Sequence, residues 1–198
     1  MPISINGSGS ITGLSVGGLP DGSVALADLA TTGTASSSTF LRGDGAFAAA
    51  GGGKLLQVVH YSTTSQFSTS SSTFVDVTNF NADIVPQTNS KVLVQVTLMS
   101  LLTSETSGGE GFGIKILRGS TAVLTSGGMY DIYDNAQGIS GAHSRNRSTW
   151  TTLDSSPGGD GSTTINYKIQ VGSHGSGNTI QITEGNMTSS MTLFEIGA

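Results

Sequence analysis

Hydrophobic and polar residues alternate in short stretches from Lys54 to the C-terminus. A period of two residues is typical of β-strands that bury one face. The clearest stretch is residues 91–102, whose shared face would carry Val92, Val94, Val96 and Leu98. The opposite face also holds apolar side chains, such as Leu93 and Met99. This second apolar set indicates partial burial there too, as in a sandwich or at a subunit contact.

Eight other stretches fit short strands, and segments rich in glycine, proline and asparagine separate them. The predicted strands are 54–61, 74–80, 91–102, 112–117, 121–125, 148–153, 163–171, 179–183 and 190–196. The turn at 118–120 would join two of them into a β-hairpin. No stretch beyond residue 54 has helical periodicity. We therefore predict an all-β domain over residues 54–198, an antiparallel β-sandwich of jelly-roll type.

The first 53 residues have a different pattern, with twelve glycines and only four charged side chains. Such a segment buries too little apolar surface to offset its own ordering entropy. Its apolar residues come in short pulses, which are typical of strips that pack against another chain. We therefore predict that residues 1–53 form an extended arm for anchoring and trimerisation; a flexible linker is the alternative. The predicted contact residues of the arm are Ile3, Ile5, Ile11, Leu14, Val16, Leu19, Phe40, Leu41 and Phe47.

Composition narrows the classes of function. Charged residues make up 11% of the 198 residues and the formal net charge is −5, so the basic patch that binds nucleic acid is not expected. There is no cysteine, which excludes disulfides and thiolate metal sites. No apolar run is long enough to cross a membrane, and the N-terminus lacks the pattern of a secretory signal. We expect synthesis in a cytoplasm and no membrane insertion.

Patterns that indicate catalysis are weak. The chain has no G-x-S-x-G elbow, and its three histidines lack the spacing of a zinc site. The glycine-rich run 108–113 leads into a predicted strand, whereas phosphate-binding loops lead into a helix. Asp131 and Asp134 could offer oxygen ligands to Ca²⁺, although solvated loop acids explain them better. We predict no catalytic residue, no metal site and no cofactor, and therefore a protein that is not an enzyme.

Residues 127–146 are poorly patterned and are interpreted as one or two exposed loops. They contain rigid aromatic and cationic side chains of the kind that dominate recognition surfaces. The predicted binding residues are Tyr130, Tyr133, His143 and Arg145. Trp150 opens a predicted strand, so we assign it to the core.

Several segments resemble bacteriophage proteins. Residues 34–47 (TASSSTFLRGDGAF) resemble a recurrent motif of tail-fibre and appendage proteins, in which it joins an N-terminal part to a distal domain. The opening SGSITGLSVGGLPDGSV resembles fibre-like segments of phages, especially aquatic ones. The segments KLLQVV, SKVLVQV, RGST, LDSSPG, INYKIQV and MTLFEI are similar to a β-rich terminal domain of such proteins.

This resemblance implies a virion structural protein, assembled in the host cytoplasm, that acts as a homotrimeric tail fibre or appendage. Its partners would be other virion proteins and a glycan or protein of the host cell surface. Two departures matter: the chain has no long repetitive shaft, and it has no enzymatic tailspike signature. An alternative is a capsid decoration protein whose arm locks neighbouring capsid subunits.

Overall fold

The computed structural model describes residues 29–49, 54–103, 110–134, 143–174 and 178–197. The chain divides into two compact units, Met1–Gly51 and Gly52–Ala198.

The described part of the first unit is a small β-hairpin. Strands β1 (Thr39–Leu41) and β2 (Phe47–Ala49) pair antiparallel, with Leu41 opposite Phe47. The Arg42-Gly43-Asp44 tripeptide lies in the turn, which Gly45 closes with a positive φ of 80°. Hydroxyl groups support the hairpin: the Thr39 side chain donates to the Thr34 carbonyl at 2.9 Å and accepts from the Ser36 N–H at 2.8 Å. Most of the motif at residues 34–47 therefore lies in a folded hairpin, which its sequence pattern did not predict.

The hairpin carries three of the predicted arm contacts. Phe40 is 61% exposed and Leu41 48% exposed, while Phe47 is half-buried. Their role in assembly stays a prediction. The other predicted contacts lie outside the described residues; they are Ile3, Ile5, Ile11, Leu14, Val16 and Leu19.

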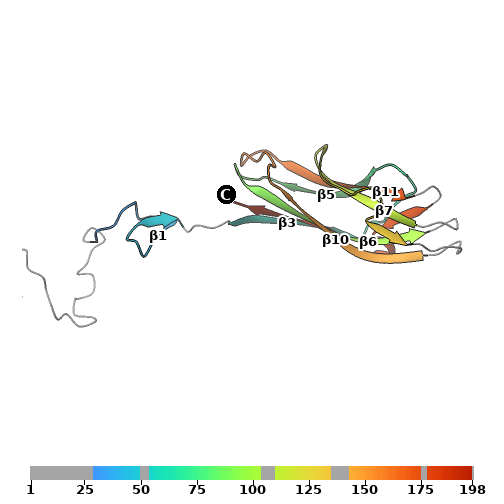
Figure 1. Cartoon of the computed structure of the whole chain (residues 1–198), viewed down its shortest axis with the longest axis horizontal. Helices are drawn as coiled ribbons and strands as arrows, with labels where there is room; N and C mark the ends of the chain where they lie inside the picture. Colours follow the sequence, from blue (N-terminus) through green and yellow to red (C-terminus); the bar gives the residue numbers. More distant parts are fainter. Residues whose placement is uncertain (1–28, 50–53, 104–109, 135–142, 175–177, 198) are drawn as a thin grey trace, which may run out of the picture. The chain divides into compact units, whose positions relative to one another are not determined.

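The second unit is built from two antiparallel sheets that pack face to face (Figure 1). The first sheet contains β3 (Leu55–Thr63), β4 (Phe67–Thr69), β6 (Lys91–Thr103), β10 (His143–Asp154), β12 (Thr179–Ile182) and β13 (Ser189–Ile196). Strand β6 lies in its middle, with β10 on one side and both β12 and β13 on the other. Strand β13 then pairs with β3, and β12 pairs with β4.

The second sheet contains β5 (Val75–Ile84), β7 (Glu110–Arg118), β8 (Thr121–Thr125), β9 (Ile132–Asp134) and β11 (Ile165–His174). Strand β11 lies between β5 and β7, and the other side of β7 pairs with β8 and β9 along different halves of its length. The turn between β7 and β8 confirms the predicted hairpin.

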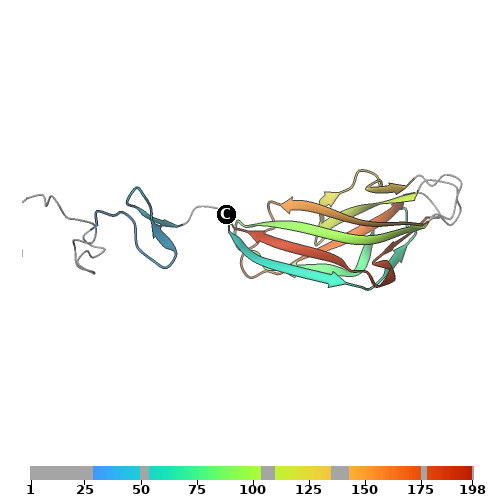
Figure 2. The same ribbon diagram turned by 90° about the horizontal axis from the view of Figure 1, so that it is seen from below.

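The order of the strands is that of a jelly roll. Strands β3 and β4, β8 and β9, and β12 and β13 each occupy one position in their sheet, which leaves eight positions. We number these eight positions by their order along the chain. Read from one edge to the other, the first sheet then contains positions 1, 8, 3 and 6, and the second sheet contains positions 2, 7, 4 and 5. This alternation between two sheets is jelly-roll connectivity. Figure 2 shows part of the first sheet face-on, with β3 in teal, β13 in red and β6 in green lying side by side. The predicted all-β sandwich is confirmed.

The core lies between the sheets and follows the predicted alternation. Val92, Val94, Val96 and Leu98 of β6 are fully buried. They face residues such as Phe112, Ile114 and Ile169 of the second sheet. Trp150 packs against this cluster, with its ring centre 6.0 Å from that of Phe112, so its assignment to the core is confirmed.

Some predicted boundaries were wrong. Residues 143–146 were interpreted as loop, but β10 begins at His143 and pairs with β6 over its whole length. The short strands β4 and β9 and the 3₁₀ turn Glu184–Asn186 were not predicted.

The two ends of the sandwich are formed by different segments of the chain. At one end the N–H of Gly197 donates to the carbonyl of Lys54 at 2.7 Å, so the chain enters and leaves the sandwich there. We call this the terminal end. At the opposite end, which we call the loop end, β6 finishes at Thr103, β11 finishes at His174 and β10 starts at His143.

A buried carboxylate joins the two sheets at the terminal end. Asp154 of β10 is 6% exposed, and both its oxygens lie within 2.8 Å of Nη1 of Arg118, which belongs to the other sheet. The hydroxyl of Tyr167, also in the other sheet, donates to Asp154 Oδ2 at 2.8 Å. Burial and the Asp154 charge raise the pKa of Tyr167, so it stays a donor. The three side chains hold the sheets together by charge-assisted hydrogen bonds.

A second buried carboxylate anchors the turn after β5. Glu195 is 1% exposed; its Oε1 accepts from the Gln87 N–H at 2.6 Å and its Oε2 from the Gln57 side chain at 2.7 Å. Burial alone would raise the pKa of Glu195, but the hydrogen bonds from Gln87, Gln57 and Ser90 together lower it. Glu195 is therefore ionised and satisfied at neutral pH.

We predict that Asp154→Ala lowers the free energy of unfolding by about 3 kcal/mol. It removes the charged partner of the partly buried Arg118 guanidinium, which keeps its hydrogen bond to the Ser156 carbonyl, and it leaves the buried Tyr167 hydroxyl without its acceptor. The matched control is Asp76→Ala, which removes an ion pair of 2.7 Å to Lys168 at a carboxylate that is 49% exposed. The control should cost less than about 1 kcal/mol. Urea unfolding at pH 7 and equal protein concentration measures both. Similar small losses in both variants would contradict a stabilising role of the Asp154 contacts between the sheets.

We also predict a pH signature for Glu195. Because its pKa is lower in the folded chain than its ordinary 4.5, its stabilisation is complete above that value and is lost as pH falls through the folded-state pKa. Glu195→Gln should be less stable than the wild type by about 2 kcal/mol at pH 7. The difference should shrink as pH falls from neutral through the acid range. Thermal unfolding along a pH series would show this, and parallel curves would refute it.

Candidate functional site

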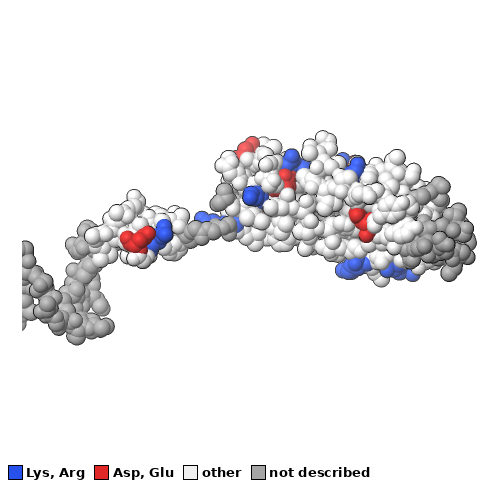
Figure 3. All heavy atoms as spheres, viewed as in Figure 1, with Lys and Arg blue, Asp and Glu red and all other residues white. Residues whose placement is uncertain are grey.

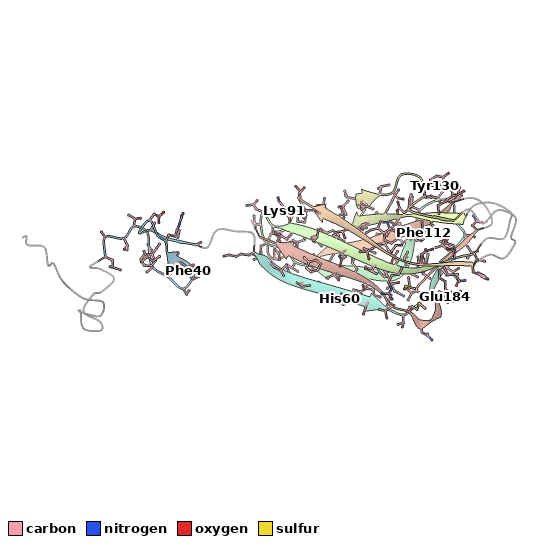
Figure 4. All side chains as sticks on the ribbon, turned by 60° about the horizontal axis from the view of Figure 1, so that its bottom comes forward. Phe40, His60, Lys91, Phe112, Tyr130 and Glu184 are labelled. Carbon is pink, nitrogen blue, oxygen red and sulfur yellow. The ribbon has the colours of Figure 1, made fainter. Side chains whose placement is uncertain are left out.

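Two exposed tyrosines and a histidine form an aromatic cluster at the loop end. The ring centres of Tyr130 and Tyr133 are 5.5 Å apart, and His174 lies 4.2 Å from Tyr130 and 5.5 Å from Tyr133. Tyr130 is 56% exposed and Tyr133 is 46% exposed. Figure 4 places Tyr130 and Lys91 at opposite ends of the sandwich. We call Tyr130, Tyr133 and His174 the aromatic cluster.

Strand pairing brings these residues together. Gly111 of β7 has Tyr133 of β9 as its partner on one side and His174 of β11 on the other. Because Gly111 has no side chain, the two rings approach each other across it. A Cβ there would lie 2.6 Å from the Ile132 carbonyl oxygen and 3.0 Å from the Tyr133 ring. The aromatic cluster therefore requires a glycine at position 111.

The segment before β9 is fixed to the second sheet by hydrogen bonds. The N–H of Ile114 lies 3.1 Å from the Ser126 hydroxyl and 3.2 Å from the Asp131 carboxylate, which both accept from it. The N–H of Ser126 donates back to the Ile114 carbonyl at 3.0 Å. Asp131, which was considered as a calcium ligand, therefore holds the segment that carries Tyr130.

Two more glycines let this segment lie directly on the sheet. A Cβ on Gly113 would meet the Ser126 hydroxyl and would lie 2.7 Å from Cα of Met129. A Cβ on Gly172 would lie 2.6 Å from Cε of Met129. Met129 itself has a positive φ of 63°, a strained conformation for a residue with a side chain. The backbone segment that carries the tyrosines is therefore held in place by its close contacts with the second sheet.

The other two predicted binding residues lie in the first sheet. His143 shares a hydrogen bond of 3.1 Å with the Thr103 hydroxyl. Arg145 forms an exposed ion pair of 3.2 Å with Glu184, which lowers the pKa of that carboxyl. The four predicted residues thus separate into Tyr130 with Tyr133 and, on the other sheet, His143 and Arg145. His174 was missed, because no local pattern marks a residue that reaches the site through strand pairing.

The aromatic cluster has the chemistry of a binding surface. Rigid rings with polar tips offer apolar faces for stacking and hydroxyl or imidazole groups for hydrogen bonds. Each ring has few rotatable bonds, so binding costs little side-chain entropy. Sugars and aromatic or cationic side chains are suitable ligands for such a surface.

A hollow with a volume of about 320 Å³ lies at the terminal end, between the turns at 88–90 and 155–159. Its lining is small polar side chains, one proline and backbone. Its lining has neither an aromatic ring nor a titratable side chain, so it offers less for recognition than the aromatic cluster.

Within the described ranges, no three histidine, aspartate or glutamate side chains are grouped as metal ligands. The same ranges contain no helix able to span a membrane.

No protein family matches this sequence, and no curated protein matches it either. Among solved structures, the chain is similar to that of the Gx strain of infectious bursal disease virus, with a TM-score of 0.37 and 12% identity over 76% of this chain. The VP2 subviral particle of that virus has a TM-score of 0.36 and 12% identity over 77% of this chain. Latent PorU from Porphyromonas gingivalis has a TM-score of 0.26 and 10% identity over 74% of it. The aligned part covers 42%, 40% and 14% of those chains. Similarity this low carries no information about function.

We predict that Gly113→Ala disrupts the support of the aromatic cluster, because the new methyl group would displace Ser126 and Met129. The amide of Ile114 should then exchange its hydrogen at least about tenfold faster, since both of its acceptors move. Gly127→Ala is the matched control in the same segment, where a Cβ meets nothing within 4 Å. Equal exchange of Ile114 in the two variants would show that the glycine is not needed.

Proposed function

We propose that this protein is a structural component of a bacteriophage virion, a trimeric tail fibre or similar appendage that contributes to host attachment. The arm would dock on the particle, and the loop end of the jelly roll would contact the host surface. Binding would occur without cleavage of the ligand.

The aromatic cluster is the observation that carries this proposal. It is exposed, it is supported by hydrogen bonds and by three glycines, and it lies at the end of the sandwich opposite to Lys54. A protein that is anchored through its N-terminal arm presents this end outward from residue 54. A receptor-binding protein needs this polarity, whereas a protein that only holds subunits together has no use for rigid exposed rings at its free end.

The arm supports the same proposal. The hairpin at 39–49 includes most of the motif at residues 34–47 and leaves Phe40 and Leu41 exposed. Large exposed apolar side chains on so small a unit are suited to contact with another protein. The resemblance of residues 34–47 to fibre and appendage proteins supports the proposal that this other protein belongs to a virion.

We predict that virions carrying Tyr130→Ala with Tyr133→Ala adsorb to host cells at least about tenfold more slowly, the effect of losing one binding hot spot. The control is Met187→Ala, an exposed apolar residue outside the aromatic cluster. Adsorption is measured as loss of free phage, and protein gels of purified particles verify that each variant is incorporated. Unchanged adsorption with normal incorporation would overturn host attachment through this end.

Antibody labelling of intact particles tests the location. Label on the tail supports the appendage. Label on the capsid, together with capsids that break on heating when the protein is absent, would establish the decoration function instead. Release of oligosaccharide from host polysaccharide by the purified protein would contradict binding without cleavage.

A further inference from the structure

The outer face of the first sheet carries an unusual apolar row near the terminal end. Strand pairing places Val58, Phe194, Leu93 and Leu153 side by side across all four positions of the sheet. Val58 is 50% exposed and Leu153 is 47% exposed, and the two residues between them are half-buried. Leu56, which is 43% exposed, extends the row toward the start of β3. The outward face of an antiparallel sheet is ordinarily polar, so a row of this kind indicates an interface.

The neighbouring rows of this face carry no permanent charge. The next row consists of His60, Thr192, Gln95 and Thr151, and the one after it of Ser62, Ser190, Thr97 and Thr149. Charged residues border these three rows: Lys91 opposite Ile196 on one side, and Arg147 opposite Met99 on the other. We call the three rows the uncharged face; His60 is its one titratable member.

The outer face of the second sheet is different. Lys168 of β11 pairs with Asp76 of β5 at 2.7 Å, and Gln170 donates to the same carboxylate at 2.8 Å. Asn166 donates to Asp83 at 2.6 Å. Charged side chains are sparse over the visible surface of the sandwich (Figure 3). The charges of the second sheet nevertheless mark it as a solvated face.

An uncharged face is compatible with contact between identical chains. Close to a symmetry axis a residue lies beside its own copy, so a fixed charge there would meet a like charge. Apolar and hydroxyl side chains can meet their own kind without this cost. The uncharged face therefore matches a second copy of this chain better than a partner that recognises charge.

The connection to the arm favours the same occupant. Residues 50–53 alone separate Ala49 from Lys54, and an extended chain of this length spans less than about 20 Å. Copies that associate through their arms would therefore hold their terminal ends close together, at a high effective concentration. The apolar row lies at that end, where β3 begins.

We infer that the uncharged face is the surface through which copies of this chain contact one another in the trimer. The inference deepens the proposed function, because it names the partner and the surface behind the predicted trimer. Association buries the apolar row, while the aromatic cluster at the other end stays accessible.

The test is the mass of the full-length protein in solution, measured by light scattering after size exclusion. The wild type should have about three times the 20.0 kDa mass of one chain. Val58→Lys with Leu153→Lys should dissociate into single chains at a concentration at least about tenfold higher than the wild type does. The control, Asn81→Lys on the outer face of β5, should keep the wild-type mass. A wild type of 20.0 kDa at all concentrations, or a double variant as stable as the wild type, would overturn the inference.

A second measurement remains decisive if the lysine variant does not fold. The chain has no cysteine, so a single Leu153→Cys or Val58→Cys substitution can form a disulfide only between copies. Mild oxidation should link these variants, alone or mixed, and should leave Asn81→Cys unlinked. Equal linking at all three positions would contradict a specific contact. These outcomes concern self-association alone: adsorption that depends on Tyr130 can hold in either case, so failure of this inference is distinguishable from failure of the proposed function.

Discussion

The register of β6 is the constraint on which the sandwich depends. Four alternate side chains of this strand are fully buried, and burying each contributes about 1.5–3 kcal/mol. A shift of the β6 register by one residue would expose all four side chains and point the side chain of Gln95 into the core. Because β10, β12 and β13 all pair with β6, its register also directs Trp150, Ile180 and Met191 inward. The same register necessarily turns Leu93 outward, in line with Phe194 and Leu153.

The sequence predicts strands where the two faces differ in polarity, and fails where they do not. Strands predicted at 91–102, 112–117 and 163–171 correspond to β6, β7 and β11, with ends that differ by up to three residues, because one face of each meets the core. The first half of β10 has polar residues on both faces, such as Arg145 outside and Asn146 inside, so its pairing depends on β6 and leaves no local pattern. The hairpin at 39–49 is held by hydroxyl and carboxylate contacts with the backbone, which hydrophobic periodicity does not report.

The sequence predicts only those residues of the candidate site that lie close together along the chain. Tyr130 and Tyr133 were selected because rigid aromatic residues stood together in a segment without strand periodicity. Their third neighbour, His174, comes from a strand far along the chain and reaches them because β9 and β11 flank the same glycine of β7. His143 and Arg145 were grouped with the tyrosines by closeness in sequence, but the pairing of β10 with β6 assigns them to the other sheet.

The hydrogen bond between Gly197 and Lys54 has a mechanical consequence. Tension between residue 54 and the opposite end of the sandwich pulls β3 lengthwise along β13, to which it is bonded from Leu55 to Thr63. Under such shear the bonds of the ladder share the load and must break together, whereas peeling an edge strand sideways breaks them one at a time. The fold is therefore oriented to resist a pull applied between its entry point and its far loops.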